Sequence, residues 1–121
     1  MKIRLHEIEL GAKEMENTNV FFQSILGLRP RLQQRDLTVF DAGIDGLDLN
    51  VSRHLLPGAA VISFLTDDLD DIENKLKVAG IAYEGPAASH LGMRCIQFLS
   101  PDGCIIKVNT PSPESPDWLK V

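Results

Sequence analysis

The sequence predicts an α+β protein made of two similar halves, each with the order strand, helix, strand, strand, strand. Residues 8–28 and 62–81 share one layout: apolar alternation, an acidic link, a helical pattern and a final glycine. Strand-like segments follow each helix, and each half has one Asp-Gly turn, Asp45-Gly46 and Asp102-Gly103. A chain of 121 residues has room for one compact domain.

In the first half, over about residues 3–53, the predicted helix carries an apolar stripe formed by Val20, Phe21, Ile25 and Leu26. We expect this helix to end at Gly27, since glycine suits the left-handed position after a helix. The apolar patterns that follow predict strands at Arg29–Gln34, Leu37–Asp41 and Gly46–Arg53.

In the second half, over about residues 59–110, the helix has apolar residues spaced three, four and three apart, at Leu69, Ile72, Leu76 and Ala79. Asp67 is the predicted N-cap, because a carboxylate there can accept a backbone N–H of the first turn. Gly80 is the predicted end. The strands predicted after it are Ile81–Glu84, Met93–Leu99 and Cys104–Asn109.

Both halves are assigned to a single domain, residues 1–110, and a proline-rich tail follows at 111–121. Trp118 and Leu119 could fix this tail either to the body of the protein or to a second subunit. One helix covers only one face of a four-stranded sheet. We therefore expect the two modules to form a curved, mixed and largely antiparallel sheet around a trough, lined by alternate strand residues.

Composition excludes several classes of function. A net charge of −5 argues against nucleic-acid binding, which requires neutralised phosphates. No apolar run is long enough for a membrane span, and the N-terminus is too polar for a secretory signal. We therefore expect a cytoplasmic protein in which Cys95 and Cys104 are free thiols.

Two motifs give the sequence a resemblance to the vicinal oxygen chelate superfamily, which includes glyoxalase I, extradiol dioxygenases and bleomycin-resistance proteins. Residues 19–28, NVFFQSILGL, resemble the end of the family's first helix. Residues 92–103, GMRCIQFLSPDG, resemble its Gly-x-Arg-x-x-x-Phe-x-Asp-Pro-Asp-Gly stretch, with Ser100 in place of the first Asp. The resemblance implies the two-module fold, a homodimer, and a divalent metal held by His or Glu at four trough positions.

The metal ligands of the family do not carry over to this chain. Lys107 stands where the last strand would supply a carboxylate, and a charged ammonium has no lone pair to give. Val61 stands at the position of the His that opens the second half. Only His6 and Asp48 remain as ligands, although Asn50 could be the equivalent residue instead of Asp48. Since catalytic zinc usually has three protein ligands, we expect no metal cofactor.

These residues lead to three hypotheses about function. The first is a metal-independent binder of a small organic molecule, in which Lys107 replaces a metal ligand and holds an anionic group. The second is a metal-dependent glyoxalase-like lyase or dioxygenase that uses His6 and Asp48. The third is a non-catalytic interaction module whose trough is closed by ion pairs from Lys107 to Asp48, Glu7 or Glu9. Strand alternation predicts that the binding site is lined by Glu7, Glu9, Asp48, Asn50, Val61, Ser63, Cys95, Gln97, Ile105 and Lys107.

Overall fold

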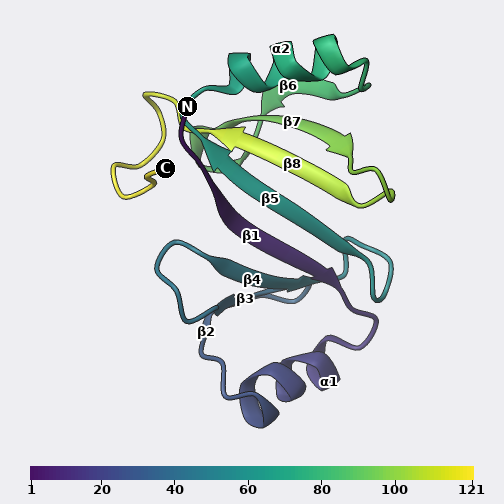
Figure 1. Cartoon of the computed structure of the whole chain (residues 1–121). Helices are drawn as coiled ribbons and strands as arrows, with labels where there is room; N and C mark the ends of the chain where they lie inside the picture. Colours follow the sequence, from purple (N-terminus) through teal and green to yellow (C-terminus); the bar gives the residue numbers. More distant parts are fainter. The chain divides into compact units, whose positions relative to one another are not determined.

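The computed structural model describes all residues, 1–121, and divides them into two compact units. Unit 1 contains Met1–His6 and Ile62–Val121, and unit 2 contains Glu7–Val61. Along the chain (Figure 1) the elements are β1 (Ile3–Gly11), α1 (Met15–Val20), a π-helical turn (Phe21–Ile25), β2 (Pro30–Gln33), β3 (Leu37–Asp41), β4 (Asp48–Ser52), β5 (Ala60–Thr66), α2 (Leu69–Ala79), β6 (Glu84–Ala88), a 3₁₀ turn (His90–Gly92), β7 (Arg94–Leu99) and β8 (Ile105–Thr110). The predicted α+β class and the repeated order of elements are confirmed.

Unit 2 has the strand order β2-β3-β4-β1. Its neighbours are antiparallel except β4 and β1, which are parallel. The core of this unit contains Phe40 and Val51 from the strands and Met15 from α1. Phe22 and Leu28 pack against it, so the first helix covers one face of these strands.

The predicted apolar stripe of the first helix is wrong. Its four residues, Val20, Phe21, Ile25 and Leu26, are between 48% and 71% exposed. The backbone after Val20 widens into a π-helical turn, in which the Leu26 N–H donates to the carbonyl of Phe21, 3.1 Å away. A five-residue hydrogen-bonding step changes the angle between successive side chains, so the ordinary helical spacing no longer identifies the buried face.

Unit 1 has the strand order β5-β8-β7-β6, and β7 is antiparallel to both of its neighbours. Leu69 and Leu76 of α2 pack against Ile96 and Val108 of the strands. Gly80 ends α2 with a φ of 71°, which confirms the predicted left-handed position. The even-numbered residues of β7 and β8 therefore face α2, and the odd-numbered residues of these two strands face the other side.

The N-cap of α2 is Asp68 and not Asp67. The Asp71 N–H donates to the Asp68 carboxylate at 3.0 Å, which satisfies one of the open donors of the first turn. The Asp67 carboxylate is used elsewhere, because it accepts the Lys2 N–H at 2.7 Å.

The predicted strand Ile81–Glu84 lies further along the chain, at Glu84–Ala88. The Ile81 N–H still belongs to the end of α2, where it donates to the Leu76 carbonyl at 2.9 Å. The strand then contains Pro86, which lacks an N–H. This is tolerated because β6 is the edge strand of unit 1.

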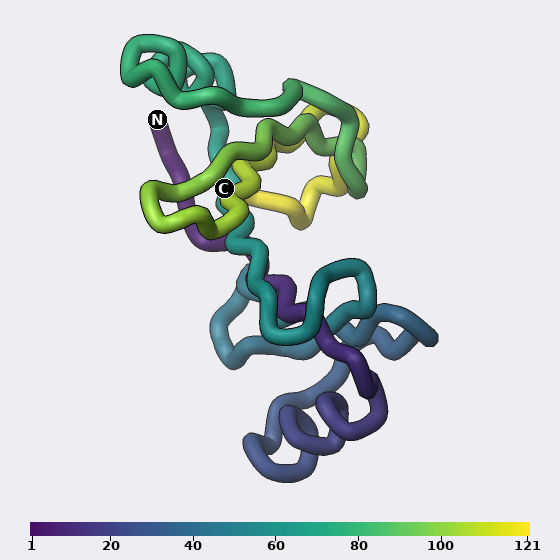
Figure 2. The backbone as a smooth tube through the Cα atoms, turned by 90° about the vertical axis from the view of Figure 1, so that its right-hand side faces the viewer, coloured from purple at the N-terminus to yellow at the C-terminus, as the bar shows by residue number.

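The C-terminal tail folds back on unit 1 (Figure 2). Leu119 is buried with Leu65 and Met93, whereas Trp118 is 69% exposed. The Ser112 hydroxyl donates to the Gly92 carbonyl at 2.6 Å. Leu119 is thus fixed to the body of its own chain.

Neither helix is long and apolar enough to cross a membrane.

Candidate functional site

A pocket with a volume of about 210 Å³ lies on the face of the unit 1 sheet that α2 does not cover. Three of the residues predicted to bind a ligand, Cys95, Gln97 and Lys107, are brought together in it. The residues that line it are Glu84, Gly85, Ala87, Ala88, Ser89, Cys95, Gln97 and Lys107. All of them belong to unit 1, from the edge strand β6 to the central strand β8.

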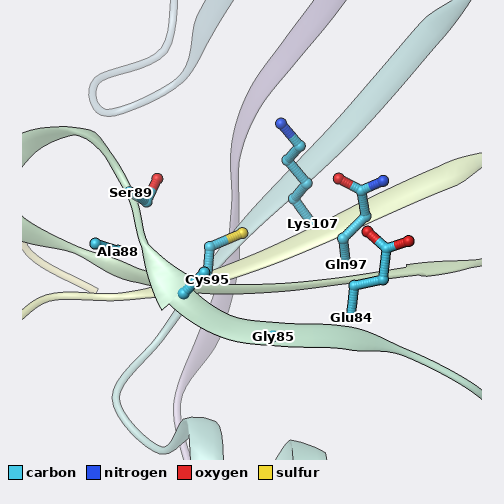
Figure 3. Close-up of a pocket in the computed structure, with 8 residues that line it drawn as sticks. Glu84, Gly85, Ala88, Ser89, Cys95, Gln97 and Lys107 are labelled. Carbon is cyan, nitrogen blue, oxygen red and sulfur yellow. The ribbon is translucent and has the colours of Figure 1, made fainter.

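The polar side chains of the pocket form a row across three strands. Glu84 of β6 is the register partner of Gln97 of β7, and Gln97 is the register partner of Lys107 of β8. Directly paired residues project to the same face of a sheet. Figure 3 shows these three side chains and the Cys95 thiol rising from the same side of the strands. A carboxylate, an amide and an ammonium therefore line one surface.

The Lys107 side chain is half-buried and forms no ion pair. Its ammonium carries three N–H donors and no acceptor. A fixed positive charge without a carboxylate partner can receive an anionic group of a ligand.

The Cys95 thiol is also half-buried. It donates a hydrogen bond to the backbone carbonyl of the next residue, Ile96, with a sulfur–oxygen distance of 3.3 Å. Burial raises the pKa of Cys95, and this outweighs the nearby Lys107 ammonium, which lowers it. A raised pKa leaves the thiol protonated at neutral pH. Cys95 therefore contributes a weakly polar surface to the pocket and does not act as a nucleophile. Cys104 is likewise a free thiol, as expected from the sequence.

The other predicted residues of the second half lie outside the pocket lining. Ser63 and Val61 of β5 are buried, at 5% and 3% exposure. Ile105 pairs with Leu99 at the hairpin end of β7 and β8. None of these three residues lines the pocket.

The predicted residues of the first half lie in unit 2, on β1 and β4. Glu7 pairs with Asp48, and Glu9 pairs with Asn50, across these parallel strands. Asp48 forms an ion pair with Arg31, and Glu9 accepts a hydrogen bond from the Ser52 hydroxyl. Asn50 is buried. The carboxylates of Asp48 and Glu9 therefore have partners within their own unit.

Sequence reasoning missed the β6 side of the pocket, which includes Glu84 and Ser89. The predicted strand Ile81–Glu84 ended at the residue where β6 begins. The small residues Ala87, Ala88 and Ser89 were the available signal, since short side chains leave space beside a strand.

Of the positions where the resemblance implies metal ligands, Lys107 and Val61 offer no lone pair, and Asp48 is paired with Arg31. Unit 1 does hold a pair of donors. His6 and His90 each offer a ring nitrogen, and these two atoms lie within 4.8 Å of each other. Imidazole nitrogen is a ligand that zinc, iron and manganese accept.

Comparison with protein-family models gives no match, and comparison with curated proteins gives none either. Solved structures do match. A glyoxalase/bleomycin resistance protein/dioxygenase superfamily member from Vibrio splendidus 12B01 has a TM-score of 0.68 at 16% identity, covering 90% of this chain and 99% of its own.

Two longer proteins match over part of their length. The Mn(II)-bound glyoxalase from Novosphingobium aromaticivorans has a TM-score of 0.67 at 24% identity, covering 88% of this chain and 38% of its own. An extradiol ring-cleaving dioxygenase from B. fuscum has a TM-score of 0.70 at 16% identity, and the match covers 96% of this chain and 34% of the dioxygenase. The strand order, the repeated module and these likenesses agree, and the chain has the fold of the vicinal oxygen chelate superfamily.

Proposed function

We propose that this protein binds a small organic molecule in the unit 1 pocket and that Lys107, rather than a metal ion, receives an anionic group of that molecule. The observation that carries the proposal is the Lys107 ammonium, which lines the pocket and has no ion-pair partner. Binding requires only a preformed site and complementary charge, and not a reactive group.

The surroundings of Lys107 support a binding role over a nucleophilic one. The Cys95 thiol beside it has a raised pKa because it is buried, and thus stays protonated at neutral pH. The remaining wall holds the polar side chains of Gln97, Glu84 and Ser89 and the small residues Gly85, Ala87 and Ala88. Such polar groups can orient a bound molecule by hydrogen bonds.

Anion titration of the whole chain tests this proposal. Butyrate and inorganic phosphate are added separately, and backbone amide shifts in β6, β7 and β8 are followed by NMR. We expect Lys107→Met to weaken binding about ten- to a hundredfold, as for a hydrogen bond to a charged group. Lys107→Arg should keep most of the affinity.

The matched control is Lys77→Met, which removes an exposed lysine from α2, on the other face of the sheet. It should leave the titrations unchanged. Equal affinity of the Lys107→Met and unmodified proteins for both anions would show that Lys107 is not the anion receptor.

A metal-dependent enzyme of the glyoxalase or dioxygenase type is the second candidate, favoured by the two imidazoles of His6 and His90 in unit 1. A divalent cation held there would act as a Lewis acid toward oxygen atoms of a substrate. This candidate uses His6 as predicted from the sequence, but with His90 in place of Asp48.

Elemental mass spectrometry after purification without chelators distinguishes the two candidates. Near-stoichiometric Mn, Fe, Ni or Zn that is lost in His90→Ala would support the metal centre. His54→Ala is the control, since His54 is 64% exposed and outside this group. Metal that stays bound in His90→Ala would assign it to other ligands.

A further inference from the structure

The charged side chains in the pocket favour a ligand with one positive and one negative group. Resting on the proposed function, we infer that the ligand is a small zwitterion, whose carboxylate meets Lys107 and whose ammonium meets Glu84. The two side chains line the same pocket from β8 and β6, at its opposite sides. A monoanion would use only one of these charges.

Glu84 and Lys107 do not neutralise each other. Neither takes part in an ion pair, for which the nitrogen–oxygen distance would be 4.0 Å or less. Gln97 of β7 lies between them in the register. Adjacent strands are about 4.8 Å apart, so the backbones of Glu84 and Lys107 are separated by roughly 10 Å. The two charged groups thus rise from different strands of one pocket wall.

Gln97, which lies between Glu84 and Lys107, can form hydrogen bonds with both charged groups of such a ligand. The Gln97 amide has a carbonyl that accepts hydrogen bonds and an NH₂ group that donates them. It can therefore accept from an ammonium on one side and donate to a carboxylate on the other. Figure 3 shows the Gln97 side chain between those of Glu84 and Lys107, with all three rising from the sheet in the same direction.

The size of the pocket and its apolar wall restrict the rest of the ligand. Ala87 faces Cys95 in the register, and both line the pocket beside the polar row. A methyl group and a protonated thiol favour a short hydrocarbon segment over further polar groups. With a volume of about 210 Å³, the pocket favours a compact amino-carboxylate over a larger molecule.

Three probes with the same four-carbon chain test this inference on the whole chain: γ-aminobutyrate, butyrate and butylammonium, each titrated with the NMR readout described above. We expect γ-aminobutyrate to bind at least tenfold more tightly than either singly charged probe. Glu84→Gln should abolish this preference while leaving butyrate affinity nearly unchanged. The control Asp70→Asn removes an exposed carboxylate from α2 and should change nothing.

A charge exchange gives the second test. Lys107→Glu alone should lose γ-aminobutyrate, and adding Glu84→Lys should restore at least part of the affinity with the ligand reversed. If butyrate binds as tightly as γ-aminobutyrate and depends on Lys107, the zwitterion is refuted and the anion-binding function stands. If no probe shifts the strand amides, both are refuted for ligands of this size.

Discussion

Replacing Leu119 with alanine should destabilise the protein markedly, although the residue is the third from the C-terminus. Leu119 is 6% exposed and shares a cluster with Leu65 and Met93, which are 0% and 1% exposed. Buried Leu→Ala changes cost about 2–5 kcal/mol, and a terminal segment can partly close the cavity, so we expect about 2–3 kcal/mol. For a chain of this size that lowers the Tm by roughly 10 °C.

Differential scanning calorimetry of Leu119→Ala beside Trp118→Ala provides the check. Trp118 is the larger residue but is 69% exposed, so its loss should shift the Tm by only about 1–2 °C. The assay therefore separates burial from side-chain size. Equal shifts in the two variants, or a larger one in Trp118→Ala, would refute the packing of the tail on unit 1.

Two further predictions concern titration. The Tyr83 hydroxyl donates to the Glu73 carboxylate at 2.8 Å, and this hydrogen bond raises the pKa of Tyr83 above its ordinary value of 10.0. The stabilisation it gives is complete below pH 10 and is lost as the pH rises through the raised pKa. Tyr83 is the only tyrosine, so absorbance at 295 nm follows it directly, and an unchanged midpoint in Glu73→Gln would contradict this account. In a Cys104→Ser background, Lys107→Met should raise the pKa of Cys95 further, because it removes the charge that lowers it. The pH dependence of iodoacetamide alkylation measures this shift, and a downward shift would mean that the Lys107 ammonium does not act on the thiol.

Local sequence patterns were sufficient to predict the fold class and the order of the elements. Alternation with period two and apolar spacing of three and four identify strands and helices without knowledge of their partners. The strand predicted at Leu37–Asp41 has those bounds in the structure, and Gly80 ends α2 as expected. Asp102-Gly103 lies in the turn between β7 and β8.

The chemistry of single positions could also be read from the sequence. Lys107 and Val61 cannot hold a metal in any conformation, because an ammonium and an isopropyl group have no lone pair to share. Cys95, Gln97 and Lys107 have the same parity on paired strands, and the pocket contains all three.

Only the tertiary structure decided which residues complete the site. The π-helical turn after Val20 moved the buried face of the first helix away from the predicted stripe. The place of β6 depended on its pairing with β7, which put Glu84 opposite Gln97. His90 reaches the neighbourhood of His6 through a turn 84 residues later in the sequence. Register and loop path are set by packing between distant segments, and a local pattern carries no information about which distant residue will lie opposite it.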